Sequence, residues 1–179
     1  MRPDYRCARL LLLIANLAFP GAIAHGADAG TAAADASSAP TIVFVCEHGS
    51  SRSLVAATLF NRIAEQRGLA VRAISRAVSA TTVDTKVPPR LVQSMSGDGF
   101  DVETFQPQAM TPAEAARASR VVVINYHGAL EAAGQRSVDH WDEIAPASIE
   151  YDKAKHALSA QIESLFGNLE PPAAVPGSK

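Results

Sequence analysis

The sequence predicts a single doubly wound α/β domain, built on a four-stranded parallel sheet that is flanked by helices. Two observations predict this fold class. Short runs of apolar, mainly β-branched residues alternate with longer segments in which apolar residues recur every three to four positions. The runs at residues 41–45 and 121–124 are apolar almost throughout, which is typical of strands that are buried on both faces of a parallel sheet.

The individual elements follow in order between residues 41 and 168. Strands are expected at residues 41–45, 70–78, 121–124 and 137–140. The first helix is expected over residues 53–66, with Gly68 after it, and the second begins at Pro88-Pro89 and ends near Gly97. Thr111-Pro112-Ala113-Glu114 is a capping box that opens a short helix to about residue 119. A last helix is expected over residues 149–166.

Both ends of the chain differ in composition from this domain. Three arginines precede a ten-residue apolar run at residues 10–19, a Pro-Gly pair and a small-residue site, which is the pattern of a secretory signal peptide over residues 1–24. Cleavage is expected after Ala24 or Ala27, and the run is shorter than the roughly 20 residues that span a bilayer. We therefore expect a periplasmic or secreted protein without a stable membrane span. Residues 25–40 are expected to form a flexible linker, and residues 169–179 a disordered tail.

Composition narrows the possible partners. The formal net charge is −2, so no basic excess indicates nucleic-acid binding. The five histidines are scattered without ligand spacing, and we expect neither a metal nor another cofactor. The two cysteines are Cys7, within the predicted signal peptide, and Cys46. After cleavage Cys46 cannot form an internal disulfide, so it is either a buried apolar residue or a reactive thiol.

Residues 45–53, with the sequence VCEHGSSRS, connect the first predicted strand to the first predicted helix. Backbone N–H groups at such a junction can surround an anion, and Gly49 permits a left-handed turn. Arg52 offers a planar fork that matches a tetrahedral oxyanion, and the same environment stabilises a Cys46 thiolate. Ser53 can donate a hydrogen bond to that thiolate. The predicted oxyanion-binding residues are Glu47, His48, Gly49, Ser50, Ser51 and Arg52.

This strand–loop–helix resembles the low-molecular-weight protein tyrosine phosphatase family, which includes structurally similar arsenate reductases. The resemblance extends over residues 41–167, through the VSAT turn at 78–81, the VPPRLV helix start and the HWD segment at 140–142. It implies that Cys46 attacks phosphorus to form a phosphocysteine, that Arg52 and the loop amides hold the oxyanion, and that Ser53 steadies the thiolate. It also implies that Ser79 supports the loop from a second layer.

The sequence departs from the family pattern in three places. Glu47 and His48 stand inside the loop, where a carboxylate works against an anionic substrate unless it points to solvent. His48 is either a binding group or a solvated or packed imidazole. Gly49 stands where the family usually has an asparagine that braces the loop. Ala145 stands where the family has the general-acid aspartate that protonates the leaving oxygen. Asp142 and Glu143 are candidate substitutes for that acid, with a solvated acidic turn as the alternative. His127 lies in the loop after the third predicted strand. It is expected to brace the anion loop or to contact substrate, with an exposed surface residue as the alternative.

We therefore expect an exported, cysteine-dependent phosphatase that acts on phosphotyrosine or aryl phosphate monoesters and binds oxyanions such as phosphate. Two alternatives remain open. The first is an arsenate reductase of the same fold, although thioredoxin-coupled members need two further cysteines that are absent after Cys46. The second is a non-catalytic module that binds an oxyanion or a phosphorylated ligand, which the missing aspartate at position 145 keeps open.

Overall fold

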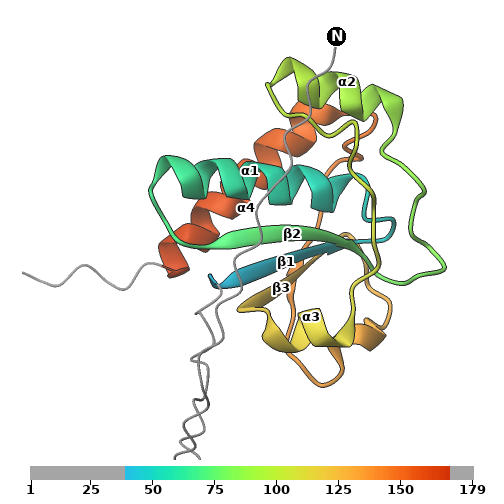
Figure 1. Cartoon of the computed structure of the whole chain (residues 1–179), viewed down its shortest axis with the longest axis vertical. Helices are drawn as coiled ribbons and strands as arrows, with labels where there is room; N and C mark the ends of the chain where they lie inside the picture. Colours follow the sequence, from blue (N-terminus) through green and yellow to red (C-terminus); the bar gives the residue numbers. More distant parts are fainter. Residues whose placement is uncertain (1–38, 170–179) are drawn as a thin grey trace, which may run out of the picture. The chain divides into compact units, whose positions relative to one another are not determined.

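The computed structural model describes residues 39–169, and these residues form a four-stranded parallel sheet with helices on both faces (Figure 1). The predicted signal peptide, most of the predicted linker and the predicted tail beyond residue 169 lie outside the described residues. The strands run in the order β2-β1-β3-β4. The elements are β1 (Thr41–Cys46), α1 (Arg52–Gln66), β2 (Arg72–Ala77), α2 (Pro89–Gly97), α3 (Pro112–Arg117), β3 (Arg120–Ile124), the 3₁₀ turn η1 (Glu131–Ala133), β4 (Asp139–Trp141) and α4 (Tyr151–Leu169).

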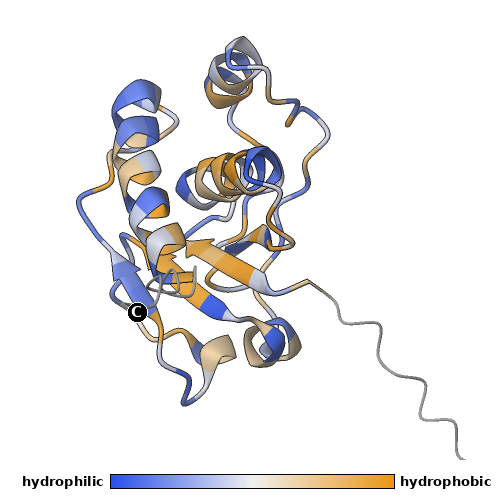
Figure 2. Cartoon of the chain, turned by 90° about the vertical axis from the view of Figure 1, so that its left-hand side faces the viewer, coloured by the Kyte–Doolittle hydropathy of each residue, from blue (hydrophilic) through white to orange (hydrophobic). Residues whose placement is uncertain are grey.

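The central strands are apolar because both faces of the sheet are covered. After Thr41, every residue of β1 is buried, and so is every residue of β3 after Arg120. Figure 2 shows these strands in orange, whereas the edge strand β4, which reads Asp-His-Trp, is blue. The predicted parallel α/β fold is thus confirmed, and the continuous apolar runs correspond to the two inner strands.

Two separate cores lie on the two faces of the sheet. One face packs against α1, α2 and α4, and the other packs against α3 (Figure 1). On the first face, Phe60 of α1 stacks on Phe166 of α4 with 4.5 Å between ring centroids, and Trp141 packs 5.3 Å from Phe44. Valines of β1 and β3 form the second core with Met110, Ala115 and Ala118. Residues of β1 and β3 contribute to both cores.

Element boundaries differ from the predictions by a few residues. The last strand is Asp139–Trp141 rather than 137–140, because the partners of β3 in register run from Asp139 to Trp141. The helix that opens with the capping box stops at Arg117 instead of residue 119. Ala118 takes an extended conformation there (ψ 140°), and the Ser119 amide donates to the carbonyl of Thr41 as the chain enters the sheet.

Two polar clusters join neighbouring elements outside the loop between β1 and α1. Tyr151 Oη and Lys155 Nζ of α4 lie 2.7 and 2.8 Å from Asp98 Oδ2 at the end of α2. The hydrogen bonds from Lys155 and Tyr151 hold the pKa of the Asp98 carboxyl below its ordinary value. Burial, followed by the hydrogen bond to Asp98, raises the pKa of Tyr151. Between β2 and α3, the Arg76 guanidinium lowers the pKa of the Glu114 carboxyl.

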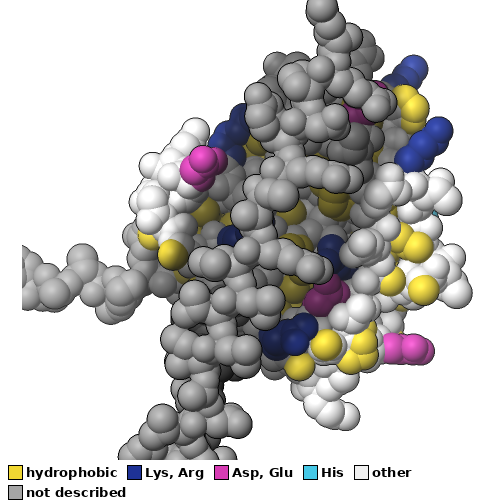
Figure 3. Space-filling view, in the orientation of Figure 1, with side chains coloured by type: hydrophobic (Ala, Val, Ile, Leu, Met, Phe, Trp, Pro, Cys, Tyr) yellow, Lys and Arg dark blue, Asp and Glu magenta, His cyan; other side chains and the backbone are white. Residues whose placement is uncertain are grey.

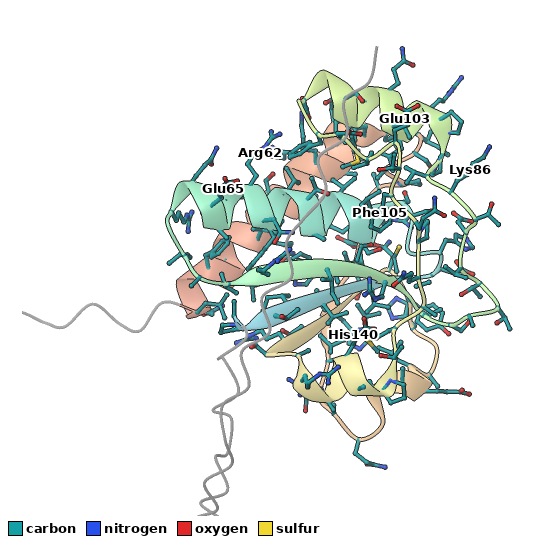
Figure 4. The ribbon with its side chains drawn as sticks, in the orientation of Figure 1. Arg62, Glu65, Lys86, Glu103, Phe105 and His140 are labelled. Atoms are coloured by element: carbon teal, nitrogen blue, oxygen red, sulfur yellow. The ribbon has the colours of Figure 1, made fainter. Side chains whose placement is uncertain are left out.

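The remaining charges are spread over the surface. Where described residues are visible in Figure 3, Lys and Arg side chains are interspersed with Asp and Glu. Figure 4 marks Arg62 and Glu65 along α1 and Lys86 in the segment between β2 and α2. Within residues 39–169, none of the helices is long and apolar enough to cross a membrane.

Candidate active site

The predicted anion-binding loop lies at the right-hand ends of the strands in Figure 1, between the end of β1 and the start of α1. We call residues 47–52 the cradle loop. Gly49 has φ +71°, so the chain turns here in a left-handed conformation. A Cβ atom at this position would lie 2.7 Å from the backbone nitrogen of Ala77. Glycine is therefore required for two reasons, the dihedral angle and the close approach of β2.

The thiol of Cys46 faces the first turn of α1. Its Sγ atom lies 3.0 Å from Ser53 Oγ, and both residues are almost completely buried within the cradle. The first N–H groups of an α-helix have no partner inside the helix, so the start of α1 presents free donors beside the thiol. Ser53 is thus placed as predicted, where its hydroxyl can donate to a Cys46 thiolate.

A second buried serine, Ser75 of β2, supports this arrangement. Its hydroxyl lies 2.8 Å from Ser53 Oγ and 3.0 Å from the carbonyl oxygen of Gly49. The side chain therefore reaches both the thiol's partner and the cradle loop. Sequence reasoning missed this residue. The signal that reveals it is a polar side chain at a buried position of β2, between Ala73 and Ala77.

The segment after β2 holds the outer side of the cradle loop. Thr82 Oγ1 donates to the carbonyl of Glu47 at 2.8 Å, and Thr82 O lies 2.8 Å from His48 Nδ1. The amide of Asp84 donates to the carbonyl of His48 at 3.1 Å. Ser50, fully buried, donates to the Asp84 carboxylate. In the family, an asparagine at position 49 braces this loop with its side chain. In this protein, neighbouring strands and turns supply the bracing.

The resemblance implied that Ser79 supports the cradle loop from a second layer. Its hydroxyl lies 2.9 Å from Thr81 Oγ1 and 3.1 Å from Thr82 Oγ1, and within residues 39–169 it has no hydrogen bond to the cradle loop itself. Thr82 Oγ1 in turn donates to the carbonyl of Glu47, so Ser79 is linked to the loop through Thr82. The supporting role of Ser79 stays a prediction.

Arg52 is held by its Nε atom, which donates to the carbonyls of Ile144 at 2.9 Å and Ala145 at 3.2 Å. Among the described residues, neither terminal nitrogen of this guanidinium has a hydrogen-bond partner. The fork is therefore oriented by the loop after β4, while its two outer donors stay available for an oxyanion. Oxyanion binding by Arg52 stays a prediction.

The side chains of Glu47 and His48 lie at the rim of the cradle loop rather than inside it. They are 58% and 51% exposed, and Glu47 Oε2 lies 3.8 Å from His48 Nε2. Because the Glu47 carboxylate reaches solvent, it does not occupy the place of the anion. Ser51 precedes α1 and caps it without a side-chain hydrogen bond, so any contribution of Ser51 to the cradle comes from its backbone.

The loop after β4, residues 142–147, has no carboxyl group at position 145. Ala145 is nearly buried, and its carbonyl accepts from Arg52. Asp142 and Glu143 are exposed, and Glu143 has φ +60°. Asp142 Oδ1 lies 3.3 Å from His127 Nε2. The structure thus brings two of the predicted residues, Asp142 and His127, into contact with each other.

No group of three or more metal-ligating side chains occurs in the part of the chain that the structure describes. The chemistry that this arrangement supports is that of a thiolate beside a helix N-terminus and an arginine fork. These groups bind a tetrahedral oxyanion and place its central atom against sulfur.

The family model for "low molecular weight phosphotyrosine protein phosphatase" matches residues 41–162. The chain belongs to this family. The match includes the cradle loop, all four strands and most of α4. Membership confirms the resemblance on which the roles of Cys46, Arg52 and Ser53 were predicted. No curated protein matches the sequence.

Three solved structures illustrate the range of this fold. A protein tyrosine phosphatase from Entamoeba histolytica is 11% identical (76% of this chain, 99% of that chain, TM-score 0.61). A thioredoxin-dependent arsenate reductase from Corynebacterium glutamicum is 17% identical (75% and 63%, TM-score 0.57). The YwlE arginine phosphatase of Bacillus subtilis, solved with a phosphorylated active-site serine, is 20% identical (74% and 97%, TM-score 0.57). At these identities the likeness shows a shared fold.

Proposed function

We propose that this protein is an exported, cysteine-dependent phosphatase that hydrolyses phosphotyrosine or aryl phosphate monoesters through a phosphocysteine on Cys46. The observation that carries the proposal is the contact of 3.0 Å between Cys46 Sγ and Ser53 Oγ inside a braced anion loop. Three hydrogen-bonding elements hold that loop, and Arg52 keeps two outer donors available. A thiol in such surroundings is arranged for nucleophilic attack.

The reaction has two steps. The Cys46 thiolate attacks phosphorus and the bond to the leaving oxygen breaks, while the N–H groups of the cradle loop and the Arg52 fork stabilise the equatorial oxygens. Water then attacks the phosphocysteine, the phosphorus–sulfur bond breaks and the thiolate returns. Ser53 and Ser75 stabilise the thiolate at both ends of this cycle.

The test is hydrolysis of para-nitrophenyl phosphate by the full chain and by a Cys46→Ser variant, with phosphate and arsenate as inhibitors. The proposal requires turnover that depends on Cys46 and competitive inhibition by both oxyanions. Phosphotyrosine and phosphoarginine peptides are compared in the same assay, because one structural neighbour is described as an arginine phosphatase. Binding of phosphate without any turnover supports the non-catalytic module instead.

An arsenate reductase is a second candidate, because one neighbour with this fold is described as a thioredoxin-dependent arsenate reductase. Thiol-coupled reduction of arsenate needs further thiols to resolve the arsenate adduct. Cys46 is the one cysteine within the described residues, which favours the phosphatase. Arsenite production with added glutathione or thioredoxin, measured beside phosphatase activity, distinguishes the two reactions.

Export is proposed from the charged and apolar pattern of residues 1–24. Expression of the full chain in a bacterial host, followed by cell fractionation and N-terminal sequencing, tests it. A mature protein that begins at His25 or Asp28 in the periplasm or medium supports export, and an intact N-terminus in the cytoplasm contradicts it.

A further inference from the structure

We propose that His127, oriented by Asp142, supplies the proton that the leaving oxygen needs, in place of the family's aspartate at position 145. This proposal rests on the proposed phosphatase function and names the acid of that reaction. Cleavage of an ester with a basic leaving group needs a proton donor, which typically contributes about 10²–10⁴-fold in rate. With alanine at position 145, the donor must come from another residue.

The sheet places this pair close to the thiol. Cys46 follows Val45, which pairs with Val123, and Ile124 pairs with Trp141, so Cys46, Ile124 and Trp141 end three adjacent strands in one row. At about 4.8 Å between strands, the Cα atoms of Cys46 and Trp141 are roughly 10 Å apart. The loops after β3 and β4 therefore begin at the same edge of the sheet as the cradle loop.

Hydrogen bonds tie the two loops to each other and to the cradle. The Asn125 amide donates to the carbonyl of Trp141 at 2.9 Å, and the Ile144 amide donates to Asn125 Oδ1 at 3.1 Å. Asn125 takes φ +50°, so the chain leaves β3 in a left-handed conformation. The carbonyl of Ile144 in turn accepts from Arg52 Nε. His127 lies two residues after Asn125, and Asp142 lies two residues before Ile144. Ile144 accepts a hydrogen bond from Arg52 directly, and Asn125 is linked to Arg52 through Ile144.

The pair has the arrangement of a proton donor with an orienting carboxylate. His127 Nε2 lies 3.3 Å from Asp142 Oδ1, and within residues 39–169 the Nδ1 atom of His127 has no hydrogen-bond partner. The histidine side chain is 74% exposed, so a substrate can reach Nδ1. An imidazolium has an N–H group on each ring nitrogen, so one nitrogen can face the carboxylate while the other donates its proton. This assigns the donor role to His127 and makes Asp142 the positioning residue.

Other titratable groups on the surrounding elements are less suited to this role. His48 Nδ1 is engaged with the carbonyl of Thr82, and its Nε2 faces Glu47. His140, marked in Figure 4, is an exposed residue of β4 whose ring stacks on that of His127, with 6.3 Å between centroids. Glu143 is an exposed carboxylate, and Arg52 carries a guanidinium that does not give up its proton in proteins.

His127 gives up one proton and regains one in each catalytic cycle. As the Cys46 thiolate forms its bond to phosphorus, the leaving oxygen departs with the proton from Nδ1 of the His127 imidazolium, which becomes neutral. In the second step Nδ1 takes a proton from the attacking water, the phosphorus–sulfur bond breaks and the thiolate leaves. The histidine thus regains its proton and phosphate is released.

The test is a leaving-group series, from dinitrophenyl phosphate to phenyl phosphate and an alkyl phosphate, for wild type, His127→Gln and Asp142→Asn. His127→Gln should lower kcat/KM about 10²-fold on phenyl phosphate but less than about threefold on dinitrophenyl phosphate. Asp142→Asn should lower it about tenfold on phenyl phosphate. The wild-type rate on phenyl phosphate should decline at high pH, and this decline should be absent in His127→Gln. His140→Gln, the matched control on the stacked ring, should behave as wild type.

Ala145→Asp, which returns a carboxyl to the family's position, should restore phenyl phosphate hydrolysis in the His127→Gln background. An equal loss on every substrate, or no loss, in His127→Gln overturns the proposal. A selective loss in Glu143→Gln instead overturns it in favour of that carboxylate. If the wild type hydrolyses dinitrophenyl phosphate with dependence on Cys46, the phosphatase function stands whatever the fate of His127. Absence of that turnover contradicts both proposals.

Discussion

The cradle loop and the loop after β4 meet at Arg52, but the structure builds them in opposite ways. Around the cradle loop, Ser50, Ser53 and Ser75 are buried, and each of their hydroxyls has a partner. In the loop after β4, the inner residues are fixed through backbone carbonyls, while the carboxylates of Asp142 and Glu143 reach solvent. The part predicted to bind the phosphoryl group is thus continuous with the core, and the part proposed to protonate the leaving group lies at the surface.

This difference predicts two kinds of variant. Changes at the cradle should affect all substrates equally and should often lower the free energy of unfolding as well. Changes in the loop after β4 should leave folding intact and should depend on the basicity of the leaving group. The following predictions test this division, beginning with the largest expected effect.

Cys46→Ser should lower kcat on para-nitrophenyl phosphate by more than about 10⁴-fold, because the nucleophile is lost. Since serine is smaller than cysteine and the site keeps its N–H groups, the dissociation constant for phosphate should change little. Steady-state kinetics and isothermal titration with phosphate measure the two quantities. Residual turnover within about tenfold of wild type would mean that the thiol is not the nucleophile.

Arg52→Lys should lower kcat/KM by about 10²–10³-fold on every substrate, including those with good leaving groups. A lysine keeps the charge but cannot donate to Ile144 and Ala145 while also presenting a planar fork. The leaving-group series separates this uniform loss from the selective loss expected for His127→Gln. A loss confined to substrates with poor leaving groups would show that Arg52 acts on the leaving group and not on the phosphoryl oxygens.

Gly49→Ala should lower the free energy of unfolding by about 2–4 kcal/mol, since strain at positive φ adds to a clash with Ala77. Gly68→Ala is the matched control. Gly68 has φ +65° but nothing within 4 Å of a Cβ atom, so only about 1–2 kcal/mol is expected. Urea denaturation measures both values. Equal losses would show that the close approach of β2 to the cradle loop has no energetic consequence.

Ser75→Ala should lower the free energy of unfolding by about 1–3 kcal/mol, because the Gly49 carbonyl loses the hydrogen bond from Ser75 and the Ser53 hydroxyl keeps, among the described residues, only its contact with Cys46. We also expect about a tenfold loss of kcat, because Ser53 is no longer held toward the thiolate. Ser79→Ala, the matched variant at the serine predicted to support the loop from a second layer, should change either quantity by less than half as much. A larger effect at Ser79 would contradict the assignment.

The smallest effect is expected at Asp98, far from both loops. Because its pKa is lowered in the folded state, its contribution to stability is present above the unfolded-state pKa near 3.8 and is lost as pH falls through the lower folded-state value. Asp98→Asn should flatten this acid limb and cost about 0.2–1 kcal/mol at pH 7. Thermal denaturation between pH 2 and 7 measures it. Activity on dinitrophenyl phosphate should stay unchanged, and an altered leaving-group dependence would show that anchoring α4 positions the loop after β4.

The sequence predicts the architecture well because the deciding signals are local. The apolar runs of β1 and β3, the capping box at Thr111 and the Cys-x5-Arg spacing each lie within a few residues. Local signals cannot show which side chains from other strands complete the site. Ser75 belongs to a strand that reads as an ordinary alternating segment, and its role appears only when β2 is placed beside β1. The same holds for Thr82 and for the pairing of His127 with Asp142.

The most direct measurement of the central claim is to trap the phosphoryl group on the protein. Full-length protein would be mixed with dinitrophenyl phosphate, quenched in acid within milliseconds and analysed by peptide mass spectrometry. We predict one phosphoryl group per chain, located on Cys46, absent from Cys46→Ala and formed at a rate no slower than steady-state turnover. Turnover without any phosphoryl group on Cys46, or with the label on another residue, would contradict the proposed mechanism.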